Sequence, residues 1–121
     1  MDNHAVLIVA HGSKVKETNS TMEMYMEALK RKAPETQFEK AYLQLMTPSV
    51  ETAIDALYEK GIRELTVFPF FLFQGNHILE DIPAVLSQLQ LKYSDLIIEF
   101  LNNIGYDEAL VELILRRAAL I

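Results

Sequence analysis

Hydrophobic positions along the chain follow two alternating patterns, continuous apolar runs and stripes at helical spacing. The continuous runs are rich in Val, Ile, Leu and Phe, which is typical of strands buried on both faces. They predict strands at Ala5–Ala10, Phe38–Leu45, Leu65–Phe70 and Leu96–Leu101. The stripes predict four amphipathic helices. These helices are expected at about Thr18–Lys32, from Thr47-Pro48 to Gly61, around Ile82–Leu89 and at about Asp107–Ala118.

Residues at the predicted helix ends agree with this assignment. Thr47 can cap a helix and Pro48 suits its first turn, while Gly61 can end the same helix. Pro83 is tolerable if it lies in the first turn of the third helix.

Strands and helices alternate strictly, which predicts an α/β fold with a parallel sheet and helices on both faces. We expect a flavodoxin-like strand order of 2-1-3-4 in a single domain over residues 1–121. In such sheets ligands bind at the carboxyl ends of the strands, beside the switch point. The sequence therefore directs attention to the loops that follow the first and third strands.

A histidine lies in each of those two loops. His11 directly follows the first strand, and His77 lies in the loop after the third. Either histidine alone could be a capping or surface residue, but together they are expected to face one crevice. Imidazole is a common ligand of divalent transition metals and the usual general base near neutral pH. Two histidines with water or a carboxylate could hold a metal loosely, leaving coordination positions open for exchange.

Composition removes several other classes of function. The 121 residues include no cysteine, so disulfides, thiolate metal sites and cysteine nucleophiles are excluded. The formal net charge of −6 disfavours a nucleic-acid partner. The sequence has no P-loop, dinucleotide-binding glycine motif or nucleophile elbow. No basic signal segment precedes the first strand and no apolar run could span a membrane, so we expect a cytoplasmic protein without a membrane partner.

Residues beside the two histidines admit two interpretations each. Gly12 and Gly75 suit a tight turn or the close approach of a ligand. Leu72 and Phe73 extend beyond the third strand, where they could pack a flat ring or a partner subunit. Glu80, with its acidic neighbour, favours a helix start, but it could also be a third ligand or proton carrier.

Four segments together resemble the small CbiX/SirB-type sirohydrochlorin chelatases. They are HGSK from His11, TPSVETAIDAL from Thr47, PFFLFQGNHILEDIP from Pro69 and NIGYDEALVELILRR from Asn103. Their order and spacing match over nearly the whole chain. The resemblance implies insertion of a divalent metal into sirohydrochlorin, a tetrapyrrole, with the metal as substrate and no organic cofactor. Cobalt is the predicted metal, for cobalamin synthesis. Iron for sirohaem, nickel for coenzyme F430 and a non-catalytic metal- or tetrapyrrole-binding protein are alternatives.

The same resemblance implies roles for individual residues. His11 corresponds to a metal ligand and proton acceptor, and His77 to a metal ligand. Thr47 and the segment Leu72, Phe73, Gln74, Gly75 and Asn76 correspond to positions that contact the macrocycle. Ser13 and Lys14 can meet the acidic side chains of a tetrapyrrole. Short family members resemble half of the longer ones, which implies a homodimer.

The chain departs from the family pattern in its second strand. Many members have a glutamate in a segment like F-L-E-L, whereas this chain reads YLQL with Gln44 at that position. Glutamine keeps an oxygen acceptor but loses the negative charge and the proton chemistry. Either Glu80 takes over that role, or two histidines and water suffice, or activity is reduced.

Overall fold

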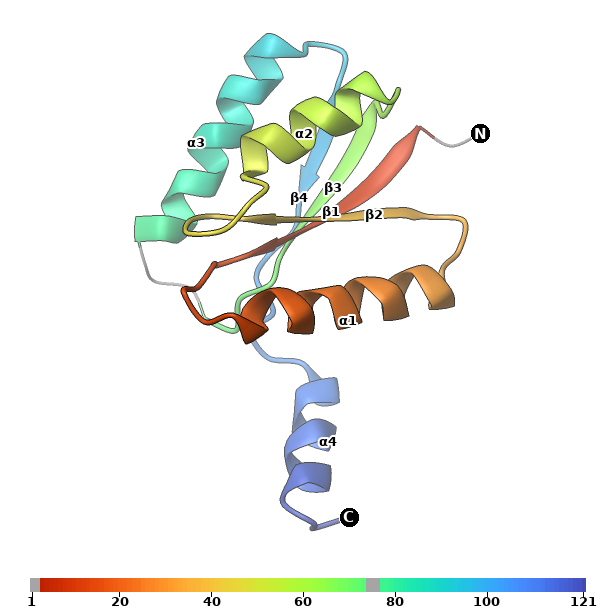
Figure 1. Ribbon diagram of the computed structural model, residues 1–121, viewed down its shortest axis with the longest axis vertical. Coiled ribbons are helices and arrows are strands. Elements are labelled where there is room, and N and C mark those ends of the chain that lie inside the picture. Colours follow the sequence, from red (N-terminus) through yellow and green to blue (C-terminus); the bar gives the residue numbers. More distant parts are fainter. Residues whose placement is uncertain (1–2, 74–76) are drawn as a thin grey trace.

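The computed structural model describes residues 3–73 and 77–121, with side chains for residues 3–73 and 81–121. Four strands alternate with four helices, as the sequence predicts (Figure 1). In chain order the elements are β1 His4–Ala10, α1 Glu17–Lys32, β2 Gln37–Tyr42, α2 Val50–Glu59, β3 Glu64–Pro69, α3 His77–Lys92, β4 Ile97–Phe100 and α4 Glu108–Arg117.

The strands form one parallel sheet in the order β2-β1-β3-β4, which confirms the predicted topology. Ala10 at the end of β1 lies beside Tyr42 of β2, and Val9 lies beside Pro69 of β3. The carboxyl ends of the three strands therefore meet at one edge of the sheet. The loops that follow them, including the residue His11, start from that edge.

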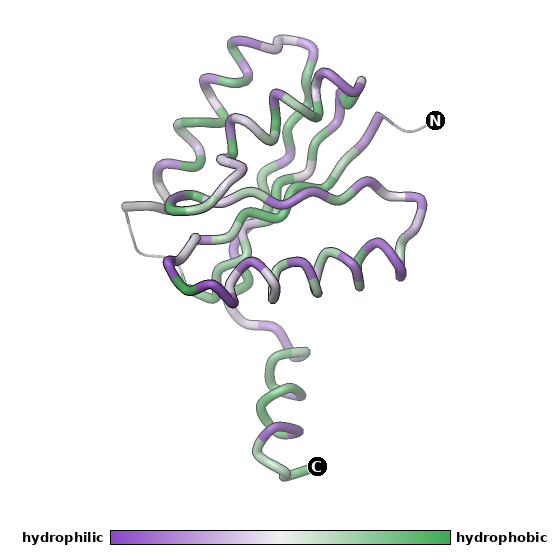
Figure 2. The backbone as a smooth tube through the Cα atoms, viewed as in Figure 1, coloured by the Kyte–Doolittle hydropathy of each residue, from purple (hydrophilic) through white to green (hydrophobic). Residues whose placement is uncertain are grey.

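Each face of the sheet has its own apolar core. On one face, alternate strand residues such as Leu7 and Val67 pack with Ile54 of α2 and Ile82 of α3. On the other face, a smaller cluster around Ile8 packs against α1. Figure 2 shows hydrophobic residues concentrated along the strands, with hydrophilic residues frequent on the helices. Among the described residues, no helix combines the length and the apolar character that crossing a bilayer requires.

The second strand is shorter than predicted. β2 ends at Tyr42, because the chain then bends and the N–H of Tyr42 donates to Pro48 O at 2.9 Å. A further hydrogen bond from Met46 N to Gln44 O closes a tight turn whose central residue, Leu45, has a φ of 66°. This left-handed conformation is incompatible with a strand. Apolar periodicity alone could not distinguish this turn from a continuing strand.

Three predicted elements also need correction at their ends. Ser49, and not Thr47, caps α2 by accepting a hydrogen bond from Thr52 N at 3.1 Å, and Thr47-Pro48 is a cis peptide. α3 begins at His77, so Pro83 lies inside the helix and beyond its first turn. β4 is shorter than predicted by one residue at each end. Gly61 does follow the end of α2, with a φ of 101° that suits glycine.

The last helix forms where predicted but does not cover the sheet. Asp107 caps α4 by accepting from Ala109 N at 2.8 Å. No residue of α4 is buried, and in Figure 1 the helix extends away from the sheet beyond α1. Helices do lie on both faces as predicted, with α2 and α3 on one face and α1 on the other.

A polar network joins α2 and α3 at the ends remote from His11. The rings of Tyr58 and Tyr93 stack with centroids 3.9 Å apart. Tyr58 donates its hydroxyl proton to Asp95 and Tyr93 donates to Asp55. The hydrogen bond from Tyr93 is the main reason why the pKa of Asp55 is lowered, and its ion pair with Lys92 lowers it further against the opposing effect of burial. The same hydrogen bond raises the pKa of Tyr93.

Candidate functional site

The loops after β1 and β2 run side by side at the carboxyl edge of the sheet. The N–H of Leu43 donates to Ala10 O at 3.0 Å, and the N–H of Gln44 donates to His11 O at 3.3 Å. These bonds extend the pairing of the two strands by two residues. They fix the backbone of His11 beside the backbone of Gln44, the position where the sequence departs from the family pattern.

Gly12 is required by this close approach. Its φ is 97°, and a Cβ placed on it would lie 1.8 Å from Gln44 O. No side chain can be accommodated at that distance unless the loop after β2 moves. The sequence left two interpretations of Gly12, a turn or the approach of a ligand. In the structure it provides a turn and admits the backbone of the chain's own neighbouring loop.

The imidazole of His11 is exposed and lies between side chains from the loops that follow the two neighbouring strands, β2 and β3. Its Nδ1 is 3.5 Å from Nε2 of Gln44, at the long limit of a hydrogen bond. On the other side its ring meets Phe71 edge to face, with centroids 5.9 Å apart. Sequence reasoning gave Phe71 no role at the site. The aromatic run that contains it was a signal, but the contact with His11 depends on the strand order.

The contact with Gln44 affects which nitrogen of His11 could bind a metal. A neutral imidazole carries one proton, and a metal binds the unprotonated nitrogen. If Gln44 donates to Nδ1, the proton is on Nε2 and that nitrogen has no free lone pair. If the amide is rotated so that its oxygen accepts from Nδ1–H, Nε2 is free to bind a metal or accept a proton. The amide therefore permits a ligand role for His11 in one of its two orientations.

Exposed apolar side chains lie on the loops at the same edge of the sheet as His11. Val15 comes from the loop after β1, Leu45 from the loop after β2, and Leu72 and Phe73 from the loop after β3. Phe73 is the most exposed of the four, at 78%. Four such side chains on loops at one edge form an apolar rim, which we define by these residues. A rim of this kind suits a flat apolar surface more than a small polar ligand.

The polar residues predicted to bind substrate lie in the same loops. Ser13 is partly buried and its Oγ accepts a hydrogen bond from Val15 N at 2.9 Å, which stabilises the turn after His11. Lys14 is exposed in that turn, and Thr47 is exposed in the loop after β2. Ser13 and Lys14 therefore lie in the turn that follows His11, and Gln44 contacts His11 from the loop after β2. Ser13 also has a structural role, because it holds Val15 N.

The other predicted residues are described only in part. Gln74, Gly75 and Asn76 lie outside the described residues. His77 and Glu80 lie in the first turns of α3, but their side chains are also outside the description. Among the side chains that are described, no group of three or more metal-ligating residues occurs. The predicted ligand set of His11, His77 and Glu80 therefore stays a prediction.

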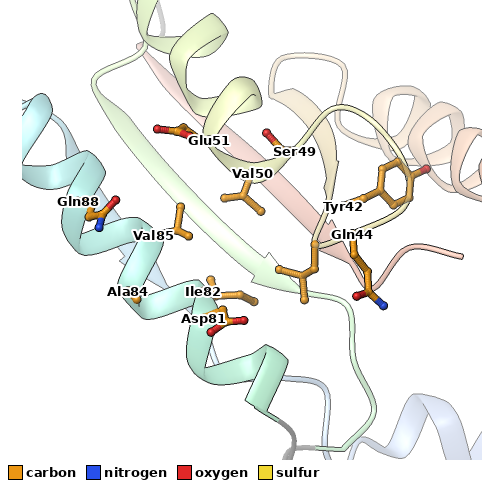
Figure 3. A pocket seen from close by; sticks show the side chains of 11 residues that line it. Tyr42, Gln44, Ser49, Val50, Glu51, Asp81, Ile82, Ala84, Val85 and Gln88 are labelled. Carbon is orange, nitrogen blue, oxygen red and sulfur yellow. The ribbon is translucent and has the colours of Figure 1, made fainter.

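A cavity of about 420 Å³ lies between α2 and α3, next to the end of β2. Figure 3 shows Val50 of α2 and Val85 of α3 facing one another across it, and Asp81 directed into it from α3. Gln44 lines the cavity as well as contacting His11. Sequence reasoning did not identify this cavity, because its walls come from two helices whose relative placement no local pattern specifies. Glu51 and Asp81 make part of its wall acidic.

Comparison with known proteins agrees with this geometry. A sequence model of the CbiX family, described as "CbiX", matches residues 5–120. The chain belongs to the CbiX family. This family membership confirms the resemblance drawn from the HGSK and GNHILEDIP segments.

Several named proteins and solved structures that are similar to the CbiX-family chain are named as sirohydrochlorin chelatases. A sirohydrochlorin cobaltochelatase of Sulfolobus acidocaldarius is 31% identical over 93% of this chain and 88% of its own. The chloroplastic sirohydrochlorin ferrochelatase of Arabidopsis thaliana is 32% identical over 77% of this chain and 41% of its own. SirB, the sirohydrochlorin chelatase of Bacillus subtilis subspecies spizizenii, solved with cobalt, has a TM-score of 0.87 and 29% identity over 98% of this chain and 50% of its own.

The CbiX-family chain spans about two-fifths of the length of the first curated relatives it matches. It spans most of the Sulfolobus protein.

Proposed function

We propose that this chain is a sirohydrochlorin chelatase, which exchanges the two inner N–H protons of the tetrapyrrole for one divalent metal ion. The observation that carries the proposal is the position of His11. It is exposed at the carboxyl edge of the sheet, placed between Gln44 and Phe71, and the loops at the same edge carry the apolar rim. Membership of the CbiX family, whose named relatives act on sirohydrochlorin, supports the same activity.

The reaction needs a base and an exchangeable metal ligand. The hydrated metal must lose water, two pyrrole protons must leave, and the four ring nitrogens must replace the lost ligands. A neutral His11 can accept one proton or bind the metal through its unprotonated nitrogen. His11 is exposed, so water can carry protons away from it. Because it has few described polar neighbours to hold a metal firmly, the metal can leave for the macrocycle.

The macrocycle is proposed to lie against the apolar rim. Leu72 and Phe73 present apolar surface to its flat face, and Val15 does so from the loop after β1. Its acidic side chains favour the side of Lys14 and Ser13. They disfavour the cavity between α2 and α3, where Glu51 and Asp81 would repel them. Thr47 and the segment Gln74–Asn76 are proposed to complete the contact.

Cobalt is the proposed metal and iron the alternative. Relatives of this chain are named for both metals, so their names do not choose between them. Nitrogen ligands such as His11 accept Co²⁺, Fe²⁺ and Ni²⁺, and the choice depends on geometry and supply. His77 is proposed as the second ligand, with Glu80 or Gln44 providing a third oxygen.

A homodimer is proposed as the active form. This chain has the length of about half of SirB, and it aligns with that half over nearly all of its residues. The exposed edge of one copy can cover only one side of a macrocycle. A second copy would cover the other side.

The activity is tested by mixing purified protein with sirohydrochlorin and Co²⁺ or Fe²⁺ under anaerobic conditions. The absorbance change that accompanies metal insertion is followed against the same mixture without protein. We expect acceleration with both metals and a larger one with Co²⁺. Binding of the tetrapyrrole without acceleration would support a carrier, the function that Gln44 in place of glutamate would favour. If the protein neither binds the tetrapyrrole nor accelerates metal insertion, the proposal is wrong.

The second ligand is tested by titrating Co²⁺ into His77→Ala and Glu80→Gln and following the visible absorption of the metal. We expect His77→Ala to weaken Co²⁺ binding by roughly tenfold or more. Wild-type affinity in His77→Ala would remove this residue from the site while leaving His11 in it.

A further inference from the structure

The imidazole of His11 is held by few contacts, although the proposed reaction depends on its direction. The side chain is exposed, and within the described residues its ring has one polar contact, 3.5 Å from Nε2 of Gln44. A hydrogen bond of that length is too weak to fix a ring that can rotate about two side-chain bonds. A second contact joins the ring to Phe71, with centroids 5.9 Å apart. Among the described residues, Phe71 is therefore the best placed to orient the imidazole.

The rings of His11 and Phe71 meet in a geometry that restricts the imidazole. Their planes are 86° apart, which is the edge-to-face arrangement that aromatic pairs prefer. Such a pair favours one ring orientation over the alternatives by roughly two- to tenfold. Because Gln44 lies on the other side of His11, a rotation that leaves Phe71 also changes the distance between the imidazole and the amide. The two neighbours therefore hold the imidazole together.

Phe71 itself is fixed by backbone hydrogen bonds and by packing. Its carbonyl accepts a hydrogen bond from Ile104 N at 2.8 Å. The next carbonyl, that of Leu72, accepts from Gly105 N at 2.9 Å and from the side-chain amide of Asn103 at 3.2 Å. The phenyl ring is partly buried against the larger apolar core. Because both its backbone and its ring are held, Phe71 can orient an exposed neighbour.

We propose that Phe71 is a positioning residue, which holds the His11 imidazole in the orientation that reaches the metal and the macrocycle. This inference rests on the chelatase function proposed above and adds a residue to it. A phenyl ring has no proton to transfer and no ligand atom for a metal, so Phe71 acts through His11. Correct placement of a reacting group contributes to the rate of the bound complex. The effect of Phe71 is therefore expected in kcat and not in the KM for the tetrapyrrole.

Phe70 provides a matched control on the other face of the sheet. It precedes Phe71 in the chain, is partly buried as Phe71 is, and meets Tyr25 of α1 edge to face with centroids 5.1 Å apart. It packs with the smaller core, on the face opposite the core that Phe71 contacts. Phe70→Leu and Phe71→Leu each remove one phenyl ring and one aromatic pair, so they should destabilise the fold to a similar extent. Only Phe71→Leu should change the surroundings of His11.

The kinetic test compares the wild type with Phe71→Leu, Phe71→Tyr and Phe70→Leu in the anaerobic metal-insertion assay, after circular dichroism has verified that each variant is folded. Phe71→Leu should lower kcat by roughly two- to tenfold and leave KM within about twofold of the wild-type value. Phe71→Tyr keeps the ring and should restore most of the rate. Phe70→Leu should keep both parameters close to those of the wild type.

Two kinetic results would contradict the positioning role. Equal losses of kcat in Phe70→Leu and Phe71→Leu would overturn it, because general destabilisation would then be the cause. A change in KM alone in Phe71→Leu, or no change at all, would also overturn it. The first would mean that Phe71 binds the macrocycle, and the second that His11 does not need its neighbour.

Nuclear magnetic resonance tests the orientation of His11 without any enzymatic activity. The His11→Gln variant identifies the ring resonances of His11 among those of the three histidines. In the wild type, nuclear Overhauser effects are expected from the His11 ring to the Phe71 ring and to the side-chain amide of Gln44. The effect to Gln44 should be weakened or lost in Phe71→Leu and should persist in Phe70→Leu. An unchanged effect in Phe71→Leu would overturn the proposal, because the imidazole would then be held without Phe71.

The two experiments separate this inference from the function on which it rests. A wild-type chain that does not accelerate metal insertion would overturn the chelatase function, and the resonance experiment would still decide whether Phe71 orients His11. An active wild type whose Phe71→Leu variant keeps both its kcat and the contact between His11 and Gln44 would overturn this inference and leave the chelatase function standing.

Discussion

Replacing Gly12 with alanine should displace the loop after β2 and disable the site while the rest of the fold persists. The Cβ of alanine would lie 1.8 Å from Gln44 O, whereas ordinary contact begins at about 3.4 Å. The difference, 3.4 − 1.8, requires a movement of about 1.6 Å by a backbone oxygen. Because Gln44 contacts His11, this movement changes the surroundings of the imidazole.

Gly61 provides a matched control. Its φ of 101° is close to the 97° of Gly12, but a Cβ on Gly61 meets nothing within 4 Å. Gly61→Ala should therefore lower the free energy of unfolding by about 1–2 kcal/mol, which is the cost of holding an alanine in a left-handed conformation. Gly12→Ala adds the steric clash, so its loss should be larger. A displacement beyond 1 Å near reacting groups can lower a rate by roughly a hundredfold.

The two variants are compared by urea denaturation and by the anaerobic metal-insertion assay. We expect Gly12→Ala to be the less stable variant and to lose most of the chelatase rate, with Gly61→Ala close to the wild-type rate. Equal stability and equal rates in the two variants would refute the reasoning, because they would show that the approach of Gly12 to Gln44 does not shape the site.

Three further changes test other parts of the structure. Ile54→Ala, at a residue 1% exposed, should lower the free energy of unfolding by about 2–5 kcal/mol, while Leu91→Ala should change it by less than about 0.5 kcal/mol. Asp55 has a lowered pKa in the folded state, so its contribution to stability is present above the pKa of the unfolded chain and is lost as the pH falls through the folded value. Tyr93→Phe should reduce this loss of stability in acid denaturation below about pH 4, and an unchanged profile would contradict the assignment. Gln44→Glu should tighten Co²⁺ binding roughly tenfold, measured by titration, and an unchanged affinity would mean that this position does not reach the metal.

The fold could be predicted because its signals are local. The continuous apolar run of β1 and the stripe of α2 indicate their elements without reference to the rest of the chain. The strand order follows from strict alternation together with the handedness of crossovers. The turn centred on Leu45 could not be predicted, because residues 43–46 are as apolar as the strand before them and the turn depends on contacts with the loop after β1.

The site could be predicted in part, because some of its residues are marked by local sequence signals. His11 was singled out by its position after the first strand and Gln44 by its departure from the family pattern, and their contact shows that the two loops meet. The contact of Phe71 with His11 and the cavity between α2 and α3 depend on side-chain placement across elements, which the sequence does not show. The direction of α4 could not be predicted, because an amphipathic pattern does not specify which surface the helix faces.

The most direct measurement is the rate of metal insertion into sirohydrochlorin by two histidine variants. His11→Gln removes the imidazole at the carboxyl edge, and His4→Gln removes one at the start of β1, where its Nε2 is 2.9 Å from Thr66 Oγ1. After subtraction of the spontaneous rate, His11→Gln should be slower than wild type by roughly a hundredfold or more, and His4→Gln should be within about twofold of wild type. A wild-type rate in His11→Gln would contradict the central claim, because metal insertion would then proceed without the residue around which the site is built.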